Sequence, residues 1–306
     1  MKNQVAIGLD IGGTSIKYGL VSSEGKVYWE SRRPTLAKTT RMVVEDNILE
    51  AVYQCLEKAE RMNLLVETIG VGTPGLVKDH NVIIGGADNI ADWVNVPLGK
   101  LISTELAMPV YVSNDAEMMA IGEYGLSSPD TASLIFITLG TGIGGAIIIN
   151  EELYRGHFGF GGELGVFPMI INGEVRNWED VASTSALIEL YQTRFDDFNN
   201  TVDGKYIFGK YLEGEQLATE TIVKWVELVG MGLAGYINIF NPGKVIIGGG
   251  VSEAGCFLID MIRNQVRRYA IKECLENVEL LPAELGNRAG FIGAAIYGIK
   301  KLKQKR

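Results

Sequence analysis

Residues 5–21 read VAIGLDIGGTSIKYGLV, an apolar run that meets an aspartate and a Gly-Gly-Thr tip before a second apolar run. Glycines at a hairpin tip let main-chain amides approach a ligand that a Cβ would block. Consecutive N–H groups at such a tip form an anion-binding concavity, and Asp10 is placed to hold a hard cation through oxygen, directly or through water. The stretch predicts two strands joined by a phosphate-binding turn with a metal anchor.

The same arrangement returns in residues 133–149, which read SLIFITLGTGIGGAIII. Two glycine-tipped hairpins about 130 residues apart suggest two related domains that face one nucleotide. Either hairpin alone could be a structural turn, since glycine-rich turns are common, but the pair in this order favours a ligand site. Gly140, Gly142 and Gly145 also match the dinucleotide fingerprint Gly-x-Gly-x-x-Gly. That motif needs a helix next, and residues 146–149 read as a strand, so a dehydrogenase is disfavoured.

The composition points to a soluble, two-domain protein. The 306 residues give room for two cores, and 47% of them are apolar. A net charge of −9 disfavours nucleic acid as a partner, because a surface that binds phosphates must be basic. Cys55, Cys256 and Cys274 lack paired spacing and fit buried thiols in a reducing compartment. We expect no signal sequence and no apolar stretch long enough to span a bilayer, hence a cytoplasmic protein without a membrane partner.

The remaining pattern alternates strands, turns and helices, which predicts an α/β sheet flanked by helices in each half. Strands are expected at residues 68–72, 109–112 and 244–247, and helices at residues 41–63, 98–107, 116–124, 184–193, 215–240 and 290–303. Between two of these helices, the segment from Phe195 to Tyr211 is polar and predicts an irregular surface excursion.

Asp115 is the leading candidate for a catalytic group. It follows the expected strand 109–112, at the strand end where ligands of open α/β sheets bind. A carboxylate there can accept the proton of a hydroxyl that is being phosphorylated, and Asn114 beside it can exchange hydrogen bonds with a polyol. The alternative is that Asn114 and Asp115 only cap a helix N-terminus.

Two further carboxylates are candidate sugar ligands. Glu163 lies in residues 159–165, GFGGELG, and so many glycines are costly unless the backbone takes unusual angles or meets a ligand. The alternative is a solvated acid on a mobile surface loop. Glu179 is a second candidate, and it could equally be an acid in the first turn of a helix.

Five motifs together resemble the motif set of the ROK family (repressors, open reading frames, kinases), in an order that covers nearly the whole chain. They are Asp10-Ile11-Gly12-Gly13-Thr14 with Lys17, Asn114-Asp115-Ala116, Leu139-Gly140-Thr141-Gly142-Ile143-Gly144-Gly145, Gly162-Glu163-Leu164-Gly165, and Gly248-Gly249-Gly250-Val251. The resemblance implies the actin-like ATPase and sugar kinase fold, with two ribonuclease-H-like α/β domains around a central cleft. It also implies ATP and Mg²⁺, with Asp115 as the base that helps to phosphorylate a small-molecule sugar, usually at O6 of a hexose.

The resemblance implies individual site residues as well. Sugar contacts are implied for Gly75, Asn114, Asp115, Glu163 and Glu179, and phosphate, adenosine or metal contacts for Asp10, Gly12, Gly13, Thr14, Lys17, Thr141, Gly142, Gly249 and Gly250. Among these, Asp10 is expected to hold Mg²⁺. The expected domains are residues 1–115 and 116–290, and the last helix, residues 291–306, is expected to pack back on the first domain.

Two departures from the family pattern bear on zinc and on specificity. Family members continue Gly-Glu-x-Gly with a histidine and then a zinc-binding cysteine cluster. Here the histidine position is Val166, and residues 170–177 contain no cysteine, so we predict no structural zinc. The resemblance implies that the histidine lies near the anomeric side of the sugar. An apolar Val166 there would accept a substituted anomeric oxygen, as in a β-glucoside.

Other functions remain open at this point. The same family contains sugar-responsive repressors, which carry a helix-turn-helix domain before the first hairpin. Because that hairpin starts by Val5 here and the chain is acidic, we expect a kinase instead. A sugar-binding protein without catalysis is disfavoured by Asp10, Asp115 and the two hairpins. The sugar could be glucose, a β-glucoside or N-acetylmannosamine, and a homodimer is expected because dimers are frequent in such families.

Overall fold

The computed structural model describes residues 3–127, 131–194, 202–250 and 255–305. They form two compact units. Unit 1 comprises Met1–Asp130, Leu153–Gly162 and Glu284–Arg306, and unit 2 comprises Thr131–Glu152 and Glu163–Ala283. The chain therefore passes from one unit to the other more than once.

The first sheet carries the first predicted hairpin. Its strands run in the order β3-β2-β1-β4-β7, with the bounds β1 (Asn3–Ile11), β2 (Ser15–Val21), β3 (Val27–Pro34), β4 (Leu64–Thr73) and β7 (Val110–Asn114). β1 pairs antiparallel with β2, as predicted, and parallel with β4, which pairs parallel with β7. From Val5 on, every residue of β1 is buried, as expected for a strand with both faces covered. The carboxyl ends of β1, β4 and β7 consequently meet at one edge.

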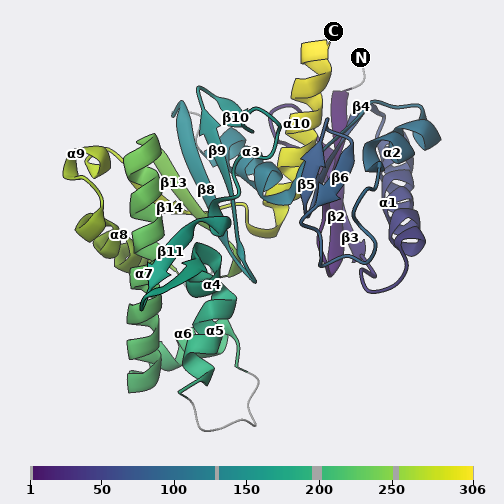
Figure 1. Ribbon diagram of the computed structural model, residues 1–306. Coiled ribbons are helices and arrows are strands. Elements are labelled where there is room, and N and C mark those ends of the chain that lie inside the picture. The colour runs from purple at the N-terminus through teal and green to yellow at the C-terminus, as the bar shows by residue number, and fades with distance from the viewer. Residues whose placement is uncertain (1–2, 128–130, 195–201, 251–254, 306) are drawn as a thin grey trace. The chain divides into compact units, whose positions relative to one another are not determined.

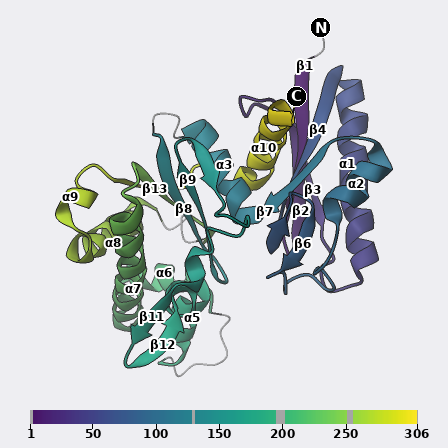
Figure 2. The same ribbon diagram turned by 45° about the horizontal axis from the view of Figure 1, so that its top comes forward.

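Helices cover both faces of this sheet. On one face lie α1 (Arg41–Arg61) and α2 (Leu98–Leu106), and on the other lie α3 (Asp115–Ser127) and α10 (Ala289–Lys305), as Figures 1 and 2 show. α1 buries Val44, Ile48, Val52 and Cys55 on one stripe, the spacing that makes a helix amphipathic. A small hairpin of β5 (Leu76–Lys78) and β6 (Val82–Gly85) follows β4, and the short helix η3 (Gly286–Arg288) precedes α10.

α10 lies against the first sheet at backbone distance. A Cβ added to Gly8 of β1 would lie 1.8 Å from the carbonyl oxygen of Phe291, and one added to Gly70 of β4 would lie 1.7 Å from that of Ala294. Only glycine permits so close an approach of two backbones. Figure 2 shows α10 in yellow beside β1 and β4, and the same helix contacts α3.

The second sheet repeats the topology of the first. Its order is β10-β9-β8-β13-β14, with the bounds β8 (Ser133–Leu139), β9 (Ile143–Ile149), β10 (Glu152–Tyr154), β13 (Lys244–Gly248) and β14 (Glu279–Pro282). β8 and β9 form the second predicted hairpin, and β8, β13 and β14 are parallel to one another. The fold class expected from the sequence, α/β with two related halves, is confirmed at the level of each sheet.

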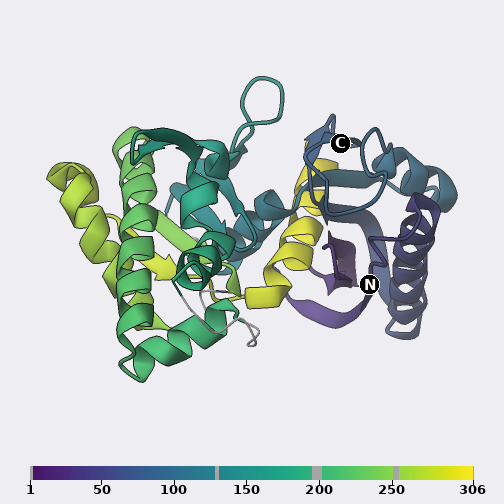
Figure 3. The same cartoon turned by 60° about the horizontal axis from the view of Figure 1, so that its bottom comes forward.

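Unit 2 is built around α7 (Gln216–Phe240), the long green helix of Figure 3, whose apolar side lies in the main core cluster with β8 and β13. The other elements of unit 2 are α4 (Trp178–Ala182), α5 (Thr184–Gln192), α6 (Gly204–Leu212), α8 (Cys256–Tyr269), α9 (Lys272–Leu275), η1 (Leu164–Val166) and the hairpin of β11 (Pro168–Ile171) and β12 (Glu174–Asn177). Among the described residues, α7 alone is long and apolar enough to cross a membrane, which we did not expect from the sequence. Its burial in the core accounts for that composition.

One element contradicts the expectation of an irregular excursion from Phe195 to Tyr211. Residues 195–201 lie outside the described part of the chain, but α6 forms a helix over the rest. Asp203 caps it by accepting a hydrogen bond from the amide of Tyr206 at 2.7 Å, and Ile207 and Phe208 bury its inner side. The capping aspartate and the two apolar residues indicate a helix locally, but the polar composition of the whole segment suggested a loop.

The cysteines agree with the expected thiols as far as they are described. Cys55 is a free, buried thiol whose pKa is raised by burial, and Cys274 is free and half-buried. The side chain of Cys256 lies outside the described part of the chain.

Candidate active site

Asp10 lies at the carboxyl end of β1, where it faces Lys17 across the hairpin. Its carboxylate is buried, with Oδ2 3.4 Å from Nζ of Lys17. Burial raises the pKa of Asp10, and the positive charge of Lys17 partly offsets this. The first turn of α10 closes over the carboxylate, because a Cβ on Gly290 would lie only 2.6 Å from Cγ of Asp10. The predicted metal anchor is therefore a buried, partly neutralised carboxylate.

Hydrogen bonds fix the start of the first hairpin tip, while the rest of the tip is exposed to solvent. The Gly12 amide donates to the carbonyl of Ser15 at 3.1 Å, and the hydroxyl of Thr35 donates to the carbonyl of Gly12 at 2.5 Å. Gly13 and Thr14 are exposed. An exposed turn on a fixed base suits a group that approaches the backbone from solvent.

Asn114 and Asp115 stand where β7 ends and α3 begins. Oδ1 of Asn114 accepts from the amides of Ala116 at 2.9 Å and Glu117 at 3.3 Å, while Oε2 of Glu117 accepts from the amide of Asn114 at 3.2 Å. This reciprocal pair is a capping box. Asn114 is therefore a helix cap, which was the alternative considered from the sequence. Asp115 follows it as the first residue of α3, and its side chain is half-buried.

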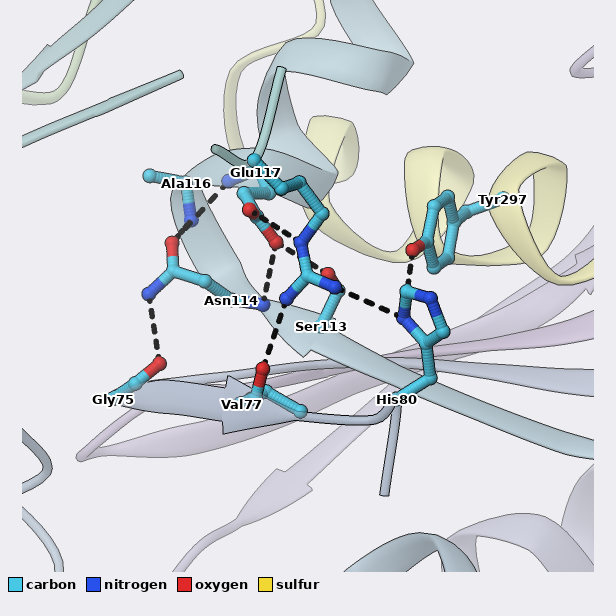
Figure 4. Close-up of polar contacts among 9 residues, drawn as sticks. Gly75, Val77, His80, Ser113, Asn114, Ala116, Glu117 and Tyr297 are labelled. Atoms are coloured by element: carbon cyan, nitrogen blue, oxygen red, sulfur yellow. Dashed lines mark hydrogen bonds and ion pairs between the residues drawn. The ribbon is translucent and has the colours of Figure 1, made fainter. Parts of the chain in front are cut away.

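Gly75 joins this corner from the loop after β4. It has a φ of 98°, and a Cβ there would lie 2.5 Å from the carbonyl oxygen of Gly85. Its own carbonyl accepts a hydrogen bond from Nδ2 of Asn114 at 3.2 Å (Figure 4). The residues for which sugar contacts are predicted in unit 1 therefore touch one another, at the edge of the sheet where β1 also ends.

A polar network that the sequence did not predict surrounds the capping box. Nε of Arg155 lies 3.0 Å from Oε1 of Glu117, and the same guanidinium contacts Nδ1 of His80 at 3.1 Å and the carbonyl of Val77 at 3.0 Å. The hydroxyl of Tyr297 lies 2.9 Å from the same His80 nitrogen (Figure 4). Burial lowers the pKa of His80 to about 4, with the charge of Arg155 as the second cause, so this imidazole is neutral at neutral pH.

In unit 2, Glu179 lies against the tip of the second hairpin. Its Oε2 accepts a hydrogen bond from the amide of Ile143 at 3.1 Å, and a Cβ on Gly142 would lie 2.4 Å from that oxygen. Glu179 is also an acid in the first turn of α4, the alternative considered from the sequence. Thr141, at the outer end of the tip, is exposed.

Gly249 and Gly250 follow β13. Gly249 has a φ of 89°, and a Cβ there would lie 2.2 Å from the carbonyl oxygen of Leu139, whereas a Cβ on Gly250 would meet nothing within 4 Å. Val251 of the same motif lies outside the described part of the chain. Gly249 thus packs on the last residue of β8, just before the tip of the second hairpin, and Gly250 borders open space.

Glu163 and Val166 flank a fixed turn rather than a loose one. Between them, the carbonyl of Leu164 accepts from the hydroxyl of Tyr236 at 2.5 Å, and a Cβ on Gly165 would lie 2.2 Å from the carbonyl oxygen of Ile143. Both flanking side chains are exposed, Val166 at 52%. The exposed carboxylate and the exposed valine therefore stand on a turn that is packed against the second hairpin.

The donor set fits Mg²⁺ held by few protein ligands. Among the described residues, no three His, Cys, Asp or Glu side chains gather into a group that could hold a metal ion. Mg²⁺ is commonly bound through one or two carboxylates together with substrate phosphates and water, which is the arrangement that Asp10 can offer. At the position of the family's cysteine cluster, the chain forms the β11–β12 hairpin.

Sequence reasoning missed Glu117 and Arg155 for different reasons. The spacing Asn114-x-x-Glu117 is the signature of a capping box, so Glu117 was readable as the partner of Asn114. Arg155 meets Glu117 across 38 positions of sequence, and no local pattern in its surroundings indicates that contact.

The comparisons with known proteins identify the family. Residues 6–301 match the ROK family. A glucokinase of Streptomyces coelicolor is 33% identical, over 95% of this chain and 96% of its own. The crystal structure of a ROK family glucokinase from Streptomyces griseus in complex with glucose and AMPPNP has a TM-score of 0.82 and 33% identity, over 97% of this chain and 99% of its own. A putative xylose repressor of Caldicellulosiruptor is 30% identical, over 97% of this chain and 78% of its own.

These matches confirm the resemblance seen in the five motifs. They also confirm the fold class, because the solved structures that match include a ROK glucokinase and a ROK hexokinase, which have the actin-like ATPase and sugar kinase fold. The chain belongs to the ROK family.

Proposed function

We infer that this member of the ROK family is an ATP-dependent carbohydrate kinase, and we propose that it phosphorylates O6 of a hexose or of a β-glucoside with Asp115 as general base. The observation that carries the proposal is the position of Asp115. It begins α3 at the carboxyl end of β7, and only β4 separates β7 from β1, at whose carboxyl end Asp10 lies. The carboxyl edge of parallel strands is where ligands of such sheets bind.

In the proposed reaction the sugar O6–H gives its proton to the Asp115 carboxylate while the oxygen forms a bond to the γ-phosphorus of ATP. The bond between that phosphorus and the β,γ-bridging oxygen breaks, and ADP leaves. Mg²⁺, when bound, would neutralise phosphate charge, and Asp10 is the residue that would hold it. We assign phosphate and adenosine contacts to the two hairpin tips and the turn after β13, through Gly12, Gly13, Thr14, Lys17, Thr141, Gly142, Gly249 and Gly250.

We assign sugar contacts to Gly75, Asn114, Glu163 and Glu179 in addition to Asp115. Val166 supports the β-glucoside version. It stands two residues beyond Leu164 on the same packed turn as Glu163 and is 52% exposed, so its side chain is available to a ligand. An apolar side chain provides no hydrogen bond to a free anomeric hydroxyl and leaves room for a substituent.

A coupled ADP-release assay over glucose, N-acetylmannosamine and cellobiose tests this function. We expect turnover with ATP and Mg²⁺, and a preference for cellobiose over the two free hexoses. Asp115→Asn should abolish turnover and leave sugar affinity, measured by calorimetry, nearly unchanged. Substantial turnover by that variant would refute the base assignment. A strong preference for a free reducing hexose would refute the β-glucoside version.

A sugar-responsive regulator is the second candidate, because the xylose repressor named above is 30% identical. The same assay separates the two functions. A regulator would bind a sugar in calorimetry without releasing ADP, whereas the kinase releases ADP in proportion to the sugar consumed.

A further inference from the structure

We propose that Arg155 is a positioning residue for phosphoryl transfer, which acts through Glu117 to hold the turn that carries Asp115. The inference rests on the proposed role of Asp115 as the base. It concerns residues of unit 1 only, since Arg155 belongs to the segment Leu153–Gly162 of that unit.

The capping box fixes the backbone on both sides of Asp115. Oδ1 of Asn114 holds the amides of Ala116 and Glu117, and Oε2 of Glu117 holds the amide of Asn114. The hydroxyl of Ser113 donates to the same oxygen of Glu117. Glu117 thus fixes the last two residues of β7, and the start of the helix follows from them (Figure 4).

Glu117 can hold the end of β7 only if a positive charge compensates its buried carboxylate. The side chain of Glu117 is 6% exposed and that of Arg155 is 14% exposed, so the pair is largely out of water. A buried carboxylate without a cation is strongly unfavourable, and it would protonate or turn toward solvent. Either response gives up hydrogen bonds at the capping box, because a protonated oxygen is a poorer acceptor.

Arg155 is itself held in one orientation. One terminal nitrogen donates to the carbonyl of Val77 and the other contacts Nδ1 of His80, which also meets the hydroxyl of Tyr297 on α10. The planar guanidinium therefore has a defined partner for each nitrogen and leaves Nε for Glu117, which a lysine cannot reproduce. The network links β5, the turn before β6, α10 and α3 to the corner that holds Asp115.

This geometry predicts a loss in kcat rather than in nucleotide binding. Arg155→Met should lower kcat by about 10- to 100-fold, the effect that a small displacement of a reacting group produces. The KM for ATP should stay within about threefold, since the variant leaves the hairpin tips untouched. Arg155→Lys should give a kcat between those of wild type and Arg155→Met, because it restores the charge without the planar fork.

Combining Arg155→Met with Glu117→Gln tests whether Arg155 acts through the charge of Glu117. The glutamine oxygen can still accept from Asn114 and Ser113, and its amide needs no counter-charge. In this background Arg155→Met should cost less than about threefold in kcat, and that non-additivity identifies Glu117 as the link. Arg61→Met is the matched control, because Arg61 pairs with Glu57 on the exposed side of α1 and is 70% exposed.

The outcomes separate this proposal from the proposed function. If the wild type releases ADP with a sugar and Arg155→Met keeps its full kcat, the positioning role is wrong and the kinase function stands. An equal loss in the wild-type and Glu117→Gln backgrounds would also overturn the proposal. If the wild type turns over no sugar, the proposed function itself fails. Circular dichroism of each variant identifies any loss that comes from unfolding, and Arg155→Lys then supplies the kinetic comparison.

Discussion

The main-chain amide of Ile143 donates a hydrogen bond of 3.1 Å to Oε2 of Glu179, so a carboxylate supports the tip of the second hairpin from within unit 2. The carboxylate also lies close to the neighbouring Gly142, where a Cβ would be 2.4 Å from the same oxygen and would push the Glu179 side chain aside. A carboxylate in this place has two possible uses, to shape the hairpin or to hold a sugar, and the two uses predict different kinetics.

We expect Glu179→Ala to raise the KM for the sugar, to which we assign Glu179, and also the KM for ATP, because the variant removes the acceptor that holds the Ile143 amide. Glu179→Gln should retain most of the ATP affinity, since its amide oxygen can accept the same hydrogen bond. Steady-state kinetics with each substrate varied in turn provide the measurement. A rise confined to the KM for the sugar would assign Glu179 to the sugar and remove its supporting role.

Gly70→Ala should destabilise unit 1. Its Cβ would lie 1.7 Å from the carbonyl oxygen of Ala294, so α10 must move away from β4. We expect a loss of more than about 3 kcal/mol in the free energy of unfolding, the range of severe overpacking. Urea denaturation checks this, with Gly235→Ala in α7 as control. A Cβ at Gly235 meets nothing within 4 Å, and alanine there should stabilise the helix by about 0.5–1 kcal/mol.

Glu123→Ala should also destabilise the protein. The carboxylate of Glu123 is buried and accepts hydrogen bonds from the amides of Glu284 at 3.1 Å and Leu285 at 2.9 Å, where the chain re-enters unit 1. Removal leaves these two amides without their acceptors, for an expected cost of about 1–3 kcal/mol in the free energy of unfolding. Glu123→Gln should cost less. Glu60→Ala, on the exposed side of α1, should unfold like the wild type in the same titration.

His80 should make the protein less stable as the pH falls from about 6.5 toward 4. Its folded pKa, about 4, is lower than the ordinary value of 6.5, mainly through burial and then through the charges of Arg155 and Lys301. In that window the unfolded chain binds a proton that the folded chain does not, so acid favours unfolding. The contribution is fully present above pH 6.5 and is lost as the pH falls.

His80→Asn should flatten this part of the profile of Tm against pH. The asparagine oxygen can occupy the place of Nδ1, and asparagine tolerates the φ of 55° found at this position. Unchanged steepness between pH 6.5 and 4 in the variant would show that another group titrates there.

The sequence predicted what is encoded locally. The two hairpins were readable because each glycine tip is flanked by apolar runs, and α7 because its apolar stripe is long. α8 and the β11–β12 hairpin were not expected, the latter because the exposed apolar residues Ile170 and Val175 interrupt the alternation of apolar and polar residues that marks a half-buried strand. The ion pair of Arg155 with Glu117 depends on packing between distant segments, and neither residue carries that information alone.

In the candidate site, too, the sequence predicted residues but not the contacts between distant segments. Residue types and spacing predicted Asp10, Asn114 and Asp115 as candidates, and the fold places all three at one sheet edge, but their roles remain predictions. What the sequence could not provide is the set of contacts that orients them, such as the bond from Asn114 to the Gly75 carbonyl.

The repeated sheet topology has a consequence for how the two halves differ. In the first hairpin Asp10 pairs with Lys17, and in the second the topologically equivalent positions are Thr138 and Gly144. In both halves the next parallel strand places a glycine beside the first of these residues. The two halves therefore share one backbone arrangement but differ in charge at this position, which is a carboxylate in the first half and a neutral hydroxyl in the second.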